Sequence, residues 1–237
     1  MMVSFSGQKG SGKTLSIVMI ANLDAQKRKI VSNIPGLNIP HHQLVRADMF
    51  CKVIDDKKST AKTEKYKLAT NWNFWKTHRG ESIYIDEIHN LVDSRDSMSH
   101  ENKAASKWVA QCRKVLTDTG DWRMLKRLRK MGNNYFSKYI YDLLTKEPNF
   151  YFNSQTTSKI DKNFRDLTDV HIHCTSNLLD DGTLLVMNFF YFGDHQYSAM
   201  DVFENNLARP KKAVFVGNPF FKDYDRFAIT ADNEAAI

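Results

Sequence analysis

Near its N-terminus the chain reads Gly7-Gln8-Lys9-Gly10-Ser11-Gly12-Lys13-Thr14, which matches the phosphate-binding pattern G-x-x-x-x-G-K-[S/T] at every fixed position. A short apolar run, Met2 to Phe5, precedes the stretch, and an apolar helical pattern follows from Leu15. Glycines let the backbone curl so that its N–H groups converge on an anion, and the following helix directs its positive dipole end there. The pattern predicts a nucleoside triphosphate site in which Lys13 contacts the β- and γ-phosphates and Thr14 holds Mg²⁺.

A second stretch, Ser82 to Glu87, is a run of apolar strand formers that ends in two carboxylates. After a phosphate loop this is the Walker B pattern, because a buried strand of the same sheet opens onto the loop at its C-terminal end. Asp86 is expected to bind Mg²⁺ and Glu87 to polarise the water that attacks the γ-phosphate. A third strand pattern ends in Ser154-Gln155, and Gln155 is predicted to sense the γ-phosphate or the attacking water.

The order of these patterns predicts an α/β protein with a P-loop NTPase core and a mainly parallel central sheet. Ile30 to Ile34 is the second strand, and its crossover from the first should be right-handed. Val170 to Phe192 is predicted to add an antiparallel hairpin through the turn Asp180-Asp181-Gly182. We expect a single ATPase domain over residues 1–217, with a basic helical insertion at 94–146, and a C-terminal tail at 218–237.

Two pairs of histidines raise the possibility of a metal site. From Pro40 to Lys67 the sequence is polar and hard to assign, and the adjacent His41-His42 fit a solvated loop better than a pair of ligands. His171 and His173 would share one face of a strand, but the sequence supplies no evident third ligand. We interpret them as polar residues at a sheet edge.

The charge of the chain is concentrated in one segment. The formal net charge is +7 and the pI is about 9.2. Between residues 107 and 130, two acidic residues are outnumbered by Lys107, Arg113, Lys114, Arg123, Lys126, Arg127, Arg129 and Lys130. Apolar stripes with Trp108 and Trp122 put these charges on the outer faces of amphipathic helices. They fit either a solvated surface or, in an ATPase, a site for the backbone of double- or single-stranded DNA.

Composition sets limits on the environment of the chain. No stretch approaches the roughly 18 to 20 apolar residues of a membrane helix, and no signal peptide precedes the first strand. The three cysteines are scattered and odd in number, which is typical of free thiols in a reducing compartment. We expect a cytosolic protein.

The ordered set of motifs resembles the zonula occludens toxin-like ATPases of filamentous phages, within the wider FtsK–HerA group. The resemblance is carried by the phosphate loop, Ile30 to Leu37, Ile85-Asp86-Glu87 and Ser154-Gln155, and by Ser158 to Leu167 followed by His171-Ile172-His173. It covers residues 1 to about 175, and the order of the pieces is its specific part because the phosphate loop alone is generic.

The resemblance implies a RecA-like core, ATP as the nucleotide and a homo-oligomeric ring, usually of six subunits. It further implies ATP-driven DNA movement or virion assembly with capsid or coat proteins. It also implies an arginine finger donated to a neighbouring subunit, for which Arg165 is the first choice and Arg127 and Arg129 are alternatives. Toxin-like members continue into a membrane-spanning segment that this sequence does not contain. We therefore expect genome packaging first, phage assembly or export at the inner membrane second, and a non-motor nucleotide switch or small-molecule kinase third.

Overall fold

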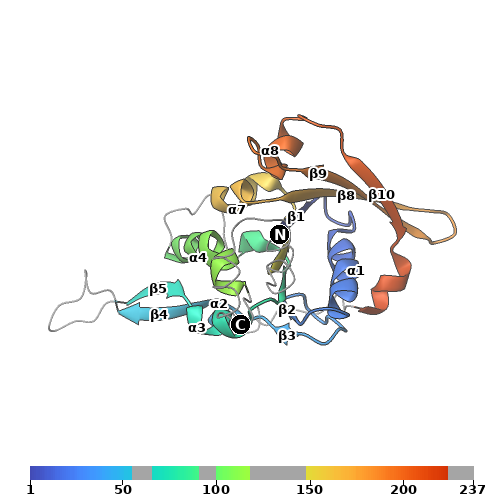
Figure 1. The fold of residues 1–237 in the computed structure, drawn as a ribbon. Helices are drawn as coiled ribbons and strands as arrows, with labels where there is room; N and C mark the ends of the chain where they lie inside the picture. The colour runs from blue at the N-terminus through green and yellow to red at the C-terminus, as the bar shows by residue number, and fades with distance from the viewer. Residues whose placement is uncertain (55–65, 91–99, 118–147, 224–237) are drawn as a thin grey trace, which may run out of the picture.

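Eight strands form one sheet in the order β10-β9-β8-β1-β7-β6-β2-β3 (Figure 1). The structure is a computed structural model that describes residues 1–54, 66–90, 100–117 and 148–223. Six neighbouring strands, from β8 to β3, are parallel, and β9 and β10 continue the sheet antiparallel. The strands of this sheet are β1 Met2–Ser6, β2 Ile30–Ser32, β3 His42–Gln43, β6 Ser82–Ile85, β7 Asn149–Asn153, β8 Val170–Leu178, β9 Leu184–Phe192 and β10 Lys211–Val216.

Short helices and one small hairpin surround this sheet. The α-helices are α1 Lys13–Ala25, α2 Arg46–Met49, α3 Trp72–Thr77, α4 His100–Leu116, α7 Lys162–Asp166 and α8 Ala199–Glu204. The 3₁₀ helices are η1 Ile88–Asn90, η3 Thr157–Lys159 and η4 Asn218–Asp223. The predicted α/β class is confirmed: the chain has the P-loop NTPase fold, with a mostly parallel sheet and an antiparallel hairpin.

Alternate residues of the parallel strands face opposite layers, as the period of two in a strand requires. Phe5, Tyr84 and Tyr151 pack on the side of α1, whereas Ile83 and Phe152 pack on the side of α4. Figure 1 shows α1 and α4 on opposite sides of the central strands. The strands read as continuous apolar runs because both faces are covered.

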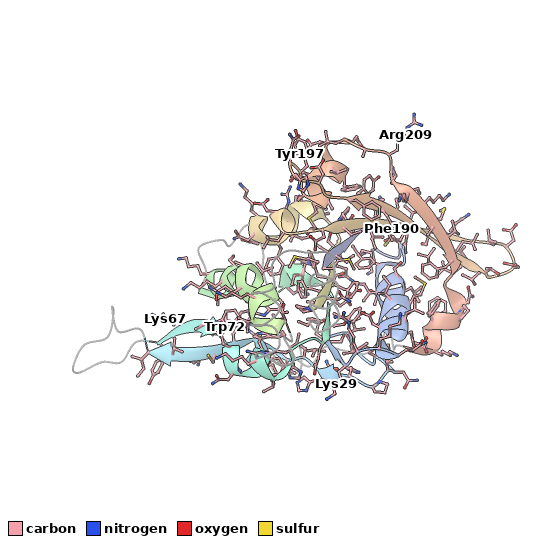
Figure 2. The ribbon with its side chains drawn as sticks, in the orientation of Figure 1. Lys29, Lys67, Trp72, Phe190, Tyr197 and Arg209 are labelled. Carbon is pink, nitrogen blue, oxygen red and sulfur yellow. The ribbon has the colours of Figure 1, made fainter. Side chains whose placement is uncertain are left out.

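The layer on the α4 side is built on aromatic rings. Trp75 and Trp108 are both fully buried, with ring centroids 4.8 Å apart. Trp108 also meets Phe150 edge-on at 4.9 Å. Trp72 and Phe74 pack against the same cluster, and Figure 2 shows Trp72 beside α4.

The α1 side is fastened by a half-buried carboxylate. Asp24, in the last turn of α1, accepts hydrogen bonds from the hydroxyls of Ser82 and Tyr84, each at 2.7 Å. Burial raises the pKa of Tyr84 well above its ordinary value, so its hydroxyl stays protonated and donates. These bonds fix the C-terminal end of α1 to the strand that carries the two site carboxylates.

The polar segment that the sequence left unassigned is not a plain loop. His42 begins the edge strand β3, and Phe50–Ile54 forms β4, which pairs antiparallel with β5, Tyr66–Thr70. His41 lies in a loop, as expected, whereas the exposed His42 belongs to β3, and its Nε2 lies 3.3 Å from Asp48 Oδ2 in α2. Asp55 to Thr60, farther along this polar segment, lie outside the described part of the chain.

The predicted hairpin between Val170 and Phe192 is confirmed, with Val170 opposite Phe192 and Leu178 opposite Leu184. β10 then pairs with β9 and forms one edge of the sheet. On this edge the ammonium groups of Lys211 and Lys212 lie over aromatic rings of β9. Figure 2 shows Phe190 within the sheet and Arg209 projecting from the segment that leads from α8 into β10.

His171 lies in the interior of the sheet, so its interpretation as an edge residue is wrong. β8 lies between β1 and β9, and His171 is fully buried. Its Nδ1 and Nε2 lie 2.7 and 2.9 Å from the hydroxyls of Ser4 and Ser6, and Ser6 also contacts His173 at 3.1 Å. Burial lowers the pKa of His171 to about 3. Within the described residues no cluster of three metal-ligating side chains occurs.

The buried imidazole predicts a loss of stability in mild acid. A histidine in the unfolded chain titrates near pH 6.5, whereas His171 stays neutral in the folded protein down to about pH 3. Protons therefore bind the unfolded state preferentially below pH 6.5. The wild type should lose about 1.4 kcal/mol more unfolding free energy per pH unit than His171→Gln between pH 6 and pH 4. Urea denaturation at a series of pH values measures this difference, with the exposed His195→Gln as a control that should retain the wild-type slope. Parallel slopes for wild type and His171→Gln would contradict the assignment.

Candidate nucleotide-binding site

The phosphate loop joins β1 to α1, as the sequence predicts. Gly12 caps α1 with φ of +85°, and Lys13 is the first helical residue. A Cβ atom at Gly12 would lie 2.7 Å from the side chain of Val186 in β9. A side chain at this position would be strained in its backbone and would also clash, so glycine is required here. The hairpin β8–β9 therefore packs directly against the loop.

Two side chains of the loop are placed to bind an anion. The Lys13 ammonium donates to the carbonyl oxygens of Gly7 and Gln8, both at 3.0 Å, which folds it back over the loop. The Ser11 hydroxyl oxygen is buried, and no hydrogen-bond partner exists for it among the described residues. An ammonium and a hydroxyl on one curled backbone fit a polyphosphate chain.

Asp86 is held from both neighbouring strands by asparagines. Asn33, after β2, accepts from the Asp86 N–H at 2.6 Å and donates to the Asp86 carbonyl at 3.1 Å. Asn153, at the end of β7, donates its amide N–H to Asp86 Oδ1. Burial raises the pKa of Asp86 above its ordinary value, and the bond from Asn153 partly offsets this shift. The carboxylate is therefore fixed in place.

Glu87 has a left-handed backbone with φ of +50°, which is uncommon for a residue other than glycine. Its N–H donates to Asn153 Oδ1 at 2.6 Å, and its carboxylate lies 3.1 Å from His89 Nδ1. The same His89 nitrogen lies 3.2 Å from the hydroxyl of Ser154. A strained backbone held by a buried amide turns the chain sharply after β6 and aims Glu87 at the loop.

One cavity of about 750 Å³ joins these elements, a volume that accommodates a nucleotide. It is lined by the loop, by Asp86, Glu87 and Gln155, and by apolar residues that include Leu178 and Phe221. The structure thus brings Lys13, Thr14, Asp86, Glu87 and Gln155 to one site. The sensing role of Gln155 stays a prediction.

The donor set fits a hydrated magnesium ion. The Thr14 hydroxyl donates to Asp86 Oδ1 at 3.3 Å, so two oxygen ligands face each other. Neighbouring ligands of an octahedral Mg²⁺ ion with bonds of about 2.0–2.1 Å are separated by about 3 Å. Both residues are hard oxygen donors, as this ion prefers. Thr14 and Asp86 would therefore hold Mg²⁺ beside the phosphates.

Arg165 and the basic segment lie apart from this cavity. Arg165 is in α7 and forms an ion pair with Glu204 of α8. Its predicted role as a finger in a neighbouring subunit therefore stays a prediction. Lys107 and Lys114 are exposed on α4, and Arg113 lies on the same helix. Five predicted DNA contacts lie outside the described residues: Arg123, Lys126, Arg127, Arg129 and Lys130.

Sequence reasoning missed the two asparagines that position the carboxylates. The sequence did contain a signal, since Asn33 and Asn153, like Asp86, each stand at the end of an apolar strand pattern. The parallel pairs β2–β6 and β6–β7 bring these three strand ends together. Strand order was the missing information.

Comparison with protein families agrees with the geometry. The family model described as Zonular occludens toxin (Zot) matches residues 1–179, which is most of the chain. The chain belongs to the Zot family. This confirms the resemblance seen in the sequence. A comparison with curated proteins gives no match.

Solved structures include a Zot protein of the same extent. The N-terminal domain of zonular occludens toxin from Neisseria meningitidis is 20% identical, with a TM-score of 0.51, and 94% of this chain covers 98% of that one. At this identity the likeness shows the fold. The DNA-packaging ATPase B204 from Sulfolobus turreted icosahedral virus is 15% identical, with a TM-score of 0.40 and coverage of 92% and 93%. Among the described residues no helix of this Zot-family chain is long and apolar enough to cross a membrane.

Because the Asn153 amide bridges Asp86 and Glu87, we expect a substitution at this position to destabilise the protein. Asn153→Asp replaces a donor to Asp86 by a second buried carboxylate, which should lower the free energy of unfolding by about 2 kcal/mol. Urea denaturation at neutral pH measures the change. Asn205→Asp is the matched control on the exposed end of α8, and it should change stability by less than about 0.5 kcal/mol. Equal stability of Asn153→Asp and the wild type would contradict the bridge.

Proposed function

We propose that the chain is a Mg²⁺-dependent ATPase. The observation that carries the proposal is the convergence of Lys13, Thr14, Asp86 and Glu87 on one nucleotide-sized cavity, at the C-terminal ends of β1 and β6. Loop and carboxylates come from sequence positions more than 70 residues apart, and the strand order brings them together. A nucleotide switch would need the loop alone, whereas the second carboxylate supports hydrolysis.

Each side chain has a distinct part in this reaction. Lys13 leaves the carbonyls of Gly7 and Gln8 and neutralises charge on the β- and γ-phosphates. Magnesium, held by Thr14 and Asp86, supplies further charge neutralisation on the phosphate oxygens. Glu87 orients a water molecule against the γ-phosphate and accepts its proton, and His89 holds the carboxylate in position. Gln155 contacts the same water or the γ-phosphate.

The first test separates hydrolysis from binding. Glu87→Gln removes the proton acceptor but keeps the size and hydrogen-bonding capacity of the side chain. ATP turnover should fall by about 100-fold or more, while the dissociation constant for ATP changes by less than about threefold. Phosphate release and calorimetric titration measure the two quantities. Glu81→Gln, whose carboxylate pairs with His78 at 2.7 Å, is the control and should keep wild-type turnover. Unchanged turnover in Glu87→Gln would exclude the proposed role.

We further propose that hydrolysis drives DNA movement during virion production, with genome packaging into a capsid as the first candidate. The support is the basic segment of the sequence, which has eight cations and two acids between residues 107 and 130. On the described part of that segment, Lys107 and Lys114 are exposed on α4, opposite the buried face that carries Trp108. Exposed cations on a helix bind phosphates without reading sequence.

Salt dependence tests this DNA-binding surface. Replacing Lys126, Arg127, Arg129 and Lys130 by alanine should weaken DNA binding and flatten the plot of log affinity against log salt. The slope should fall by roughly one unit for each phosphate that the segment no longer neutralises. Fluorescence anisotropy with a labelled duplex, at about 50 to 200 mM salt, provides the measurement. The control removes four lysines elsewhere: Lys27, Lys52, Lys76 and Lys222. A slope that does not differ between the two variants would show that the segment is only solvated surface.

Family membership favours a second candidate, assembly or export of a filamentous phage at the host inner membrane. The Zot match covers residues 1–179, the part that contains the phosphate loop, both carboxylates and Gln155. In this role the chain acts in the host cytoplasm, reaches the membrane through a partner and contacts coat proteins. Both candidates use a homo-oligomeric ring, with six subunits favoured, in which Arg165 reaches the site of a neighbour.

A further inference from the structure

The residues that line the cavity fall into two chemical sets, and phosphate chemistry accounts for only one of them. The polar half of the lining consists of the phosphate loop, Asp86, Glu87 and Gln155. The apolar half includes Leu178 and Leu184 of the β8–β9 hairpin, Gly182 in its turn and Phe221 of η4. Leu178 is 67% exposed and Phe221 is 40% exposed. Accessible apolar side chains in the same cavity as an anion site fit an apolar part of the ligand.

We propose that this apolar half holds the nucleobase, which stacks on the ring of Phe221 against Leu178 and Leu184. The inference rests on the proposed nucleotide site and adds the position of the nucleobase, which that site does not specify. Because one cavity contains both halves, a nucleotide with its phosphates on the loop can extend its base only along this cavity, and its γ-phosphate faces Asp86 and Glu87. We call the apolar half of the cavity the slot. The hairpin that forms it contacts the loop directly, because the Gly10 carbonyl accepts a hydrogen bond from the Ser176 hydroxyl of β8 at 2.7 Å.

The position of Phe221 is fixed by polar contacts of η4. Asp223 accepts from the Asn22 side chain of α1 at 3.0 Å, and its carbonyl accepts from the Asn38 N–H at 2.7 Å. At the other end of η4, a Cβ on Gly217 would lie 3.1 to 3.3 Å from Leu184, Leu15 and Val186. The helix is thus fastened to α1 and β9, and the ring of Phe221 is held at the cavity.

The slot offers no polar side chain to read the edge of a base. The polar residues that line the cavity among the described residues all belong to the loop or to the ends of β6 and β7. Backbone groups of the hairpin turn are already paired: Leu184 N–H donates to Asn218 Oδ1, and Gly182 carbonyl accepts from Asn218 Nδ2. Every base has an apolar face, so recognition by stacking favours purines for their area and separates adenine from guanine only weakly.

The experiment compares nucleotides with a ligand that has no base. Calorimetric titrations of the full chain with Mg²⁺ use ATP, GTP, CTP and inorganic tripolyphosphate. Phe221→Ala should weaken ATP binding roughly tenfold and leave the affinity for tripolyphosphate unchanged. Phe221→Leu keeps an apolar contact without a ring, so its affinity for ATP should lie between that of the wild type and that of Phe221→Ala. In the wild type, ATP and GTP should bind within about threefold of each other, and CTP more weakly.

Phe220→Ala is the matched control, since the Phe220 ring packs on Phe215 at 5.8 Å and does not line the cavity. It should bind ATP as the wild type does. Two results would contradict binding of the base in the slot: an equal loss of ATP affinity in Phe220→Ala and Phe221→Ala, or wild-type ATP affinity in Phe221→Ala. Neither result would contradict the phosphate site. A strong preference for ATP over GTP would overturn recognition by stacking alone. If neither ATP nor tripolyphosphate binds the wild type, the proposed ATPase function fails as well.

Discussion

One asparagine amide governs the geometry of the site. Asn153 donates to the Asp86 carboxylate and accepts from the N–H of Glu87, so both carboxylate-bearing residues take their positions from the end of β7. This works only because β7 lies between β1 and β6 in the sheet. With β7 inserted, β1 and β6 lie two strand spacings apart, roughly 9.6 Å. This separation leaves room for phosphates and a metal ion between the two strand ends.

The fold maintains this spacing by covering both faces of the parallel strands. On one side Asp24 fastens α1 to β6 by two hydroxyl hydrogen bonds, and on the other the Trp75–Trp108 pair packs against Phe150. Neither of these two groups of side chains lines the nucleotide cavity. A strand that is packed on both faces cannot shift its register by one residue, because the shift would exchange its two faces. The site is therefore as rigid as the interior beneath it.

Much of this arrangement could be predicted from the sequence. The phosphate loop, the two carboxylates after Ile85 and the hairpin of β8 and β9 have local patterns, so motif and periodicity located them correctly. The roles of Asn33, Asn153 and Phe221 could not be found in this way, because each depends on a neighbour distant in the chain. His171 was misjudged for the same reason: its place in the middle of the sheet follows from strand order. The strands β3 and β4 were not predicted, because short, half-exposed strands carry little apolar periodicity.

The two borders of the eight-stranded sheet differ in a way that bears on solubility. One border, β3, has only two residues, while the other, β10, has six and an almost fully exposed surface. A long, open strand invites backbone pairing with another molecule and so promotes aggregation. Lys211 and Lys212 place two cations at the start of β10, where their ammonium groups lie over the rings of Phe192 and Phe189. Parallel pairing of two such strands would bring these like charges together, so the two lysines disfavour that mode of association.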